Sequence, residues 1–186
     1  MFLLNSSMIK RYLAEKIIEI EQFNEKNLLP TFYYFSLGDC VGIWNENLNS
    51  YKYQRYENAN NLIIPARGYV LIKSLERFSL SNKVLGLFSQ ISSLPQAGIR
   101  LNHSLSVDPG FKGRLEMGLE NVLNKDAVIP IGSAIGKIVF FDVTDTYPIE
   151  NIDERVIMRE KLKRRENLDK PEEIELREEY RKMFTD

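Results

Sequence analysis

The chain has 186 residues, enough for one domain with a substantial hydrophobic core and a terminal extension. Its hydrophobic content of 44%, charged content of 27% and formal net charge of −1 are ordinary for a soluble globular protein, and they exclude a surface that attracts nucleic acid or membrane through overall charge. No apolar run approaches the roughly 18 residues of a membrane span, and the single cysteine, Cys40, rules out an internal disulfide. We therefore expect a cytoplasmic protein with no nucleic-acid or membrane partner.

A short helix is predicted near the N-terminus. Ser6 and Ser7 can cap this helix at its start. The apolar residues that follow at helical spacing are Met8, Tyr12 and Leu13. The spacing no longer favours a helix in the apolar segment 17–20, so the helix should end before it.

The middle of the chain has the pattern of short β-strands. Runs rich in β-branched and aromatic residues alternate with Gly, Pro, Asn and Asp at the even spacing typical of a β-barrel or sandwich. The polar segment 45–61, rich in Asn and Tyr, is expected to form an exposed hairpin or loop. The clearest strand patterns cover residues 69–72, 83–88, 115–121 and 136–141.

The C-terminal segment 151–186 has a different composition. It contains no glycine, and its 36 residues include ten Lys or Arg and eleven Asp or Glu. Mixed charge without glycine favours helix, and we predict helices over about 153–166 and 171–184, with Pro171 in a first turn. We therefore divide the chain into a barrel domain, 1–150, and a charged helical extension, 151–186. The extension is either a solvated or subunit-bridging helical pair or an arm that docks on a protein partner.

Several sequence segments, in order, resemble one known family. Residues 68–99 (GYVLIKSLERFSLSNKVLGLFSQISSLPQAGI) run from a strand with a Leu-Glu pair through a second strand to Ser-Ser-Leu and a glycine. The most specific segment is VDPGFKG, residues 107–113. The other matching segments are LLPTFYYFSLGDCV (28–41), LEN (119–121), IPIG (129–132) and IGKIVF (135–140). Because of these motifs, the chain is identified over residues 3–145 as a member of the dCTP deaminase and dUTPase superfamily. It is most similar to dCTP deaminase.

This resemblance implies a fold and an assembly. The fold is a mainly β, distorted jelly-roll barrel of the dUTPase-like, β-clip type, with its core from about Phe32 to Val143 and helices at both ends. Family members build their sites between the subunits of a trimer, so the resemblance also implies a homotrimer. The apolar run 129–141 exceeds what one barrel face needs, which agrees with an additional interface.

The segment Asp108–Gly113 has turn chemistry of its own. Pro109 fixes φ near about −65° and Gly110 accepts a positive φ, which predicts a type II turn, while Gly113 allows the next strand to begin close to a neighbour. Asp108 is either an Asx-type residue that caps its own backbone or the residue that holds a nucleotide. The resemblance implies the second role, in which this aspartate faces the sugar in deaminases and orients the attacking water in dUTPases.

The resemblance places a catalytic glutamate five residues after the last glycine of this turn, and that position is Gly118. Glu116 and Glu120 share a strand face with it, each displaced along the strand by about 7 Å. With Asp108 they are the candidates for a relocated catalytic acid. The family uses no zinc, and one Cys and one His do not build a closed metal shell, so we expect no metal and no cofactor except Mg²⁺ accompanying a nucleoside triphosphate.

Other positions that the family uses are changed. Two arginines that would contact phosphate correspond to Ile91 and Gln96, while the serine pair is kept as Ser92 and Ser93. The family's serine, aspartate and arginine near the front correspond to Phe32, Tyr34 and Ser36. Nearby cations that either replace the arginines or are solvated surface charges are Arg100, Lys112 and Arg114.

The only histidine, His103, follows these segments beside Ser104. It is either a general base, since imidazole titrates near neutrality, or a hydrogen-bonded structural residue. The candidate nucleotide-binding residues are therefore Ser92, Ser93, Gln96, His103, Ser104, Asp108 and Gly113.

Three functions remain open at this point. The first is a trimeric, non-catalytic or weakly active homologue that binds a dCTP- or dUTP-type deoxynucleotide or a protein, with a regulatory role. The second is an active dCTP deaminase or dUTPase-type hydrolase with relocated catalytic residues. The third is an unrelated β-barrel binding module. The tail has neither the glycine-rich arm of dUTPases nor the basic, aromatic arm of deaminases, which favours the first.

Overall fold

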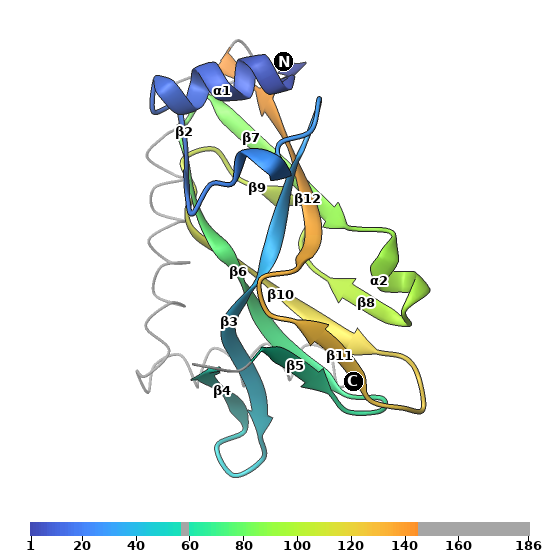
Figure 1. Ribbon diagram of the computed structural model, residues 1–186. Coiled ribbons are helices and arrows are strands. Elements are labelled where there is room, and N and C mark those ends of the chain that lie inside the picture. Colours follow the sequence, from blue (N-terminus) through green and yellow to red (C-terminus); the bar gives the residue numbers. More distant parts are fainter. Residues whose placement is uncertain (57–59, 145–186) are drawn as a thin grey trace, which may run out of the picture. The chain divides into compact units, whose positions relative to one another are not determined.

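The computed structural model describes residues 1–56 and 60–144 (Figure 1). The helices of this part are α1 (Ser6–Ala14), the 3-10 helix η1 (Glu25–Asn27) and α2 (Ser93–Gln96). Its strands are β1 (Phe2–Leu3), β2 (Ile18–Glu21), β3 (Tyr33–Asn45), β4 (Ser50–Arg55), β5 (Asn61–Ile64), β6 (Tyr69–Leu80), β7 (Val84–Gln90), β8 (Ile99–Asn102), β9 (Ser106–Val107), β10 (Lys112–Asn121), β11 (Ala127–Pro130) and β12 (Ala134–Asp142). No helix in these two ranges is long and apolar enough to cross a bilayer.

The strands form one curled antiparallel sheet and a small separate ribbon (Figure 1). The main sheet has ten strands with the path β8-β10-β6-β3-β12-β7-β9, and β4, β2 and β1 add to β3, β6 and β12 respectively. The ribbon consists of β5 and β11. This arrangement confirms the expected mainly β, jelly-roll-like fold.

Strand β3 joins the two halves of the main sheet. Tyr34 at its start pairs with β12, and from Leu37 onward the strand pairs with β6, with a register shift between Leu37 and Val41. A Cβ atom at Gly38 would lie 2.6 Å from the Lys73 carbonyl oxygen, so only glycine lets the two backbones approach this closely. The sheet therefore bends where β3 passes from one half to the other.

The alternation of side chains along β6 separates the core from the face that carries the candidate site. Val70, Ile72 and Phe78 are buried, whereas Tyr69 and Lys73 on the other face remain partly or largely exposed. Strand β10 pairs with β6, with a register shift between Arg114 and Glu116, and continues this outer face. The largest fully buried side chains of the core are Tyr33, Phe35, Phe78 and Phe140.

Helix α1 confirms the predicted N-terminal helix but begins with another cap. The Asn5 side chain accepts a hydrogen bond from the Met8 amide at 3.0 Å, so Asn5 rather than Ser6 or Ser7 is the N-cap residue. The helix packs on the sheet with the expected apolar face. Tyr12 is buried together with Ile9, and Met8 and Leu13 are half-buried against the core.

The other local predictions fall into two groups. Strands β3 and β4 form the hairpin expected in the segment 45–61, with a left-handed Asn49 at φ 48° in its turn. Strand β2 confirms that the apolar segment after α1 is not helical. The two C-terminal helices and the domain boundary near residue 150 lie outside the described residues and stay predictions.

Candidate functional site

The predicted turn before β10 has the expected geometry. The Phe111 amide donates to the Asp108 carbonyl oxygen at 3.0 Å, and Gly110 has φ 74°, as a type II turn requires. The turn residue Asp108 is exposed, and its Oδ1 atom accepts from Ser106 Oγ at 3.5 Å. The carboxylate thus contacts a side chain rather than capping its own backbone.

Gly118, where the sequence resemblance predicts a catalytic glutamate, is covered by Tyr69. Gly118 lies opposite Leu71 of β6 and Asn102 of β8. A Cβ atom at Gly118 would clash with the hydroxyl and ring of Tyr69, which begins β6 opposite Glu120. A side chain at residue 118 and the Tyr69 ring therefore compete for one volume.

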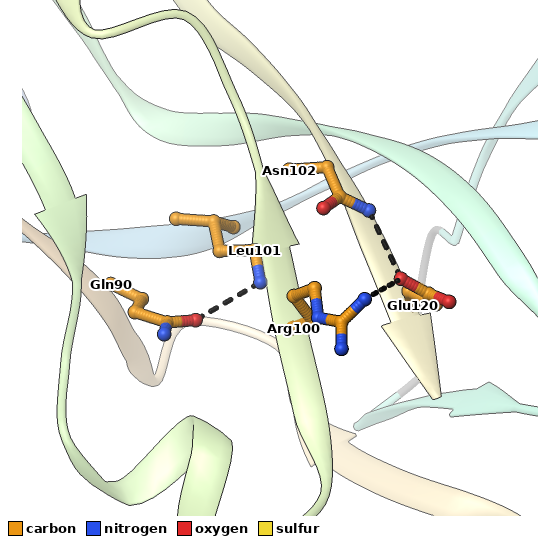
Figure 2. Close-up of polar contacts among 5 residues, drawn as sticks. All are labelled: Gln90, Arg100, Leu101, Asn102 and Glu120. Atoms are coloured by element: carbon orange, nitrogen blue, oxygen red, sulfur yellow. Dashed lines mark hydrogen bonds and ion pairs between the residues drawn. The ribbon is translucent and has the colours of Figure 1, made fainter. Parts of the chain in front are cut away.

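The two neighbouring carboxylates are both engaged. On one side of Gly118, Lys73 Nζ lies 3.4 Å from Glu116 Oε2. On the other, Glu120 Oε2 accepts from Arg100 Nη1 and from Asn102 Nδ2, each at 3.4 Å (Figure 2). Each glutamate thus faces a cation on its own side of Gly118, and neither carboxylate extends over Gly118.

Aromatic side chains extend from Tyr69 across the same face. Tyr51 of β4 lies 6.3 Å from the Tyr69 ring and 5.2 Å from the Trp44 ring, measured between centroids. We call Trp44, Tyr51 and Tyr69 the aromatic row. Burial raises the pKa of the Tyr69 hydroxyl, and the nearby Tyr51, Glu120 and Glu116 add to this effect. The hydroxyl is therefore protonated throughout the physiological pH range.

The segment expected to bind phosphate lies on and before α2. Ser92, Ser93 and Gln96 are exposed, and Ile91 packs against the core instead of presenting a charge. Just before them the Gln90 side chain accepts from the Leu101 amide at 3.0 Å and ties β7 to β8 (Figure 2). The segment therefore offers hydroxyl and amide groups to solvent but no cation.

Of the cations considered as replacements for the missing arginines, two have carboxylate partners. Arg100 pairs with Glu120, and Arg114 Nη1 lies 3.2 Å from Asp39 Oδ1. Lys112, at the start of β10, is exposed.

His103 has the contacts of a structural residue. Its Nδ1 atom donates to the Ser104 carbonyl oxygen at 2.7 Å, and its ring lies 4.5 Å from that of Phe88. Ser104 is exposed. In the described part of the chain, no hydrogen bond or ion pair links Glu116 or Glu120 to the other candidate residues. Those residues are His103, Ser104, Asp108, Ser92 and Ser93. The candidates thus form separate groups on this chain.

A second polar site, which the motifs did not predict, lies where β3 leaves β12. Glu76 is 1% exposed, and its Oε2 atom accepts from the Ser36 amide at 2.8 Å. Burial raises the pKa of its carboxyl group. Glu76 and Ser36 line a cavity of about 210 Å³ whose other lining residues are Gln22, Asn24, Asn27, Leu75, Gly132 and Ala134. Of the family's other front positions, Phe32 and Tyr34 pack edge to face at 5.0 Å.

Comparison with known proteins connects these features to one family. A family model described as dCTP deaminase-like matches residues 3–143. A dCTP deaminase of Thermococcus gammatolerans is 35% identical over 133 residues, which cover 72% of this chain and 80% of that protein. The corresponding protein of Pyrococcus horikoshii is 35% identical over 130 residues, 70% of this chain and 79% of the relative.

A solved structure agrees with this at the level of the fold. The 2'-deoxycytidine 5'-triphosphate deaminase of Agrobacterium tumefaciens superposes with a TM-score of 0.61 at 14% identity, and the match covers 74% of this chain and 48% of that one. The sequence motifs, the curled sheet and the matched span of residues 3–143 agree with one another. The chain belongs to the dCTP deaminase-like family.

Proposed function

We propose that this chain is a nucleotide-binding, regulatory member of its family with little or no deaminase activity. The observation that supports this most is the pairing of Gly118 with Tyr69. Residue 118 has no side chain, its side-chain volume is filled by the Tyr69 hydroxyl and ring, and the flanking Glu116 and Glu120 face cations. Among residues 1–56 and 60–144, no carboxylate on this face is therefore placed to activate water beside Gly118.

The missing groups affect both chemistry and binding. A positioned general acid or base contributes about 10²–10⁴-fold to a rate. Each lost charged contact to a phosphate, at Ile91 and Gln96, weakens binding by about 1.5–3 kcal/mol. Because the two deficits act on different steps, they compound, and restoring one of them alone would not produce an efficient enzyme.

The ligand we propose is a dCTP- or dUTP-type nucleotide with Mg²⁺ as its counterion, held between the subunits of a homotrimer. In this arrangement the exposed Asp108 of one subunit faces the sugar, while Ser92 and Ser93 of another contact phosphate oxygens. An intersubunit site also accounts for the separation of these groups on one chain. The C-terminal extension is proposed as an arm that bridges subunits or docks on a protein partner.

A second candidate function is an active deaminase or dUTPase-type hydrolase with relocated catalytic residues. The observation that favours it is the 35% identity to two proteins named dCTP deaminase. Glu116, Glu120 and Asp108 are the residues that such an enzyme would use.

Nucleotide binding can be tested without assuming turnover. We expect dCTP or dUTP with Mg²⁺ to raise the melting temperature of the wild-type protein, and Asp108→Asn to abolish the shift. Glu46→Gln, an exposed position in the hairpin between β3 and β4, serves as the matched control and should keep it. A wild-type protein whose melting temperature no nucleotide changes would contradict the proposed function.

A further inference from the structure

Tyr69 occupies the part of the candidate site where the reacting group of a nucleobase would be expected. It starts β6 directly opposite Glu120, and its hydroxyl reaches across to the backbone of Gly118. The side chain remains 39% exposed, so a ligand on this face can contact it. Its ring also continues into the aromatic row through Tyr51, which provides an apolar surface beside the hydroxyl.

The Tyr69 hydroxyl has free hydrogen-bonding capacity. In the described part of the chain only burial and nearby charges, and no hydrogen bond, act on the pKa of this hydroxyl, and the charges include Glu116 and Glu120. Both glutamates are instead paired with Lys73 and Arg100. Because burial keeps the phenol protonated, the hydroxyl can both donate and accept a hydrogen bond, whereas an ionised carboxylate only accepts.

We infer that the Tyr69 hydroxyl is the group with which this site recognises the base, and that the site takes 4-amino and 4-oxo pyrimidine nucleotides alike. This inference rests on the proposed nucleotide-binding function. The phenol O–H donates to the oxygen of a 4-oxo pyrimidine, and the phenol oxygen accepts from the amino group of a 4-amino pyrimidine. The aromatic row would stack against a base of either kind.

The test is isothermal titration of the full-length protein with dCTP and with dUTP, each with Mg²⁺. The variants are Tyr69→Phe, which keeps the ring that covers Gly118, and Tyr56→Phe as the matched control. Tyr56 also has a phenol, which accepts a hydrogen bond from the Gln54 side chain on the edge strand β4. The wild type should bind the two nucleotides within about threefold of each other, a difference of less than one net hydrogen bond.

Tyr69→Phe should weaken the binding of both nucleotides by about three- to tenfold, the value of one hydrogen bond, and Tyr56→Phe should change neither. Unchanged binding in Tyr69→Phe, or a preference of the wild type above about tenfold for one nucleotide, would overturn the inference and leave the proposed function standing. Failure of the wild type to bind either nucleotide would overturn both.

Discussion

The hydroxyl of Tyr69 lies where the first side-chain atom of residue 118 would lie, so these two positions on neighbouring strands are complementary in size. We expect Gly118→Ala to destabilise the protein by about 1 kcal/mol, the lower end of the cost of overpacking, because the partly exposed Tyr69 ring can swing aside. The same substitution in a Tyr69→Ala background should cost close to nothing. Chemical denaturation of the four proteins gives the coupling free energy directly.

Gly42→Ala is the matched control for this cycle. Gly42 lies on the same face, on β3, but a Cβ atom there would be 3.0 Å from the nearest atom of the Tyr53 ring, a much smaller overlap. Gly42→Ala should lower the free energy of unfolding by less than Gly118→Ala does, and by the same amount whether residue 69 is Tyr or Ala. A Gly118→Ala penalty that persists in the Tyr69→Ala background would show that the two residues do not compete for space.

Glu76 makes the stability of the protein depend on pH. Burial raises the pKa of its carboxyl group, so its contribution to stability is fully present below the pKa of the unfolded chain and is lost as the pH rises through the folded-state value. Glu76→Gln keeps an acceptor for the Ser36 amide and removes the titration. The free energy of unfolding of this variant, relative to wild type, should therefore increase between about pH 4.5 and pH 8.

Glu19→Gln, an exposed position on β2, is the control for this series and should follow the wild-type curve. Parallel curves for wild type and Glu76→Gln over the whole range would mean that folding does not raise the pKa of Glu76, and would contradict this prediction. The free energies are obtained from urea titrations at each pH.

Tyr12 connects α1 to the last described strand, because its hydroxyl donates to the Asp142 carboxylate. Burial alone would raise the pKa of Asp142, but hydrogen bonds from Tyr12 and Thr144 outweigh it and hold the pKa below the usual value. Tyr12→Phe should lower the free energy of unfolding by about 2 kcal/mol at neutral pH, as expected for a hydrogen bond to a charged group. The stability from this pair is present above the unfolded pKa of the aspartate and is lost as the pH falls through the folded one.

The control for Tyr12→Phe is Tyr56→Phe, which removes a hydrogen bond between two uncharged side chains. It should lower the free energy of unfolding by about 1 kcal/mol or less. Urea denaturation at pH 7 and pH 3 measures both variants. A Tyr12→Phe penalty that is the same at the two pH values would argue against an ionised Asp142 as the acceptor.

We expect a homotrimer because the proposed nucleotide site lies between subunits. Exposed apolar residues on the ribbon agree with an interface: Ile63 and Val128 lie directly opposite each other and are 57% and 59% exposed. Multi-angle light scattering at micromolar concentration should give three times the 21.7 kDa mass of the chain. We expect Ile63→Lys to shift this mass toward the monomer, and a wild-type monomer would contradict the proposed intersubunit site.

Local chemistry explains which features could be predicted from the sequence. Pro109 and Gly110 determine the turn by their own backbone preferences, and the strand patterns predicted an all-β core close to the observed span of β3–β12. The predicted N-cap was wrong because three good capping residues, Asn5, Ser6 and Ser7, are adjacent in sequence. The packing of the helix on the sheet decides which of them is the cap.

The features that could not be predicted depend on contacts between distant segments. The Tyr69 ring covers Gly118 only because β6 and β10 pair in the observed register, and no local pattern fixes that register. Glu76 belongs to a recognised Leu-Glu pair, but its burial follows from the bend of β3, which places the Ser36 amide within hydrogen-bonding distance. An acidic residue is otherwise expected at the surface.

We expect this protein not to deaminate dCTP at an enzymatic rate, and the deciding measurement is ammonia release from dCTP in the presence of Mg²⁺. The assay compares wild type with Glu116→Gln, Glu120→Gln and Asp108→Asn. We expect no release above background for any of the four proteins, since Gly118 provides no acid or base and Tyr69 fills its place. Wild-type turnover of about 1 s⁻¹ that is lost in one of the three variants would contradict this expectation and identify the relocated catalytic residue.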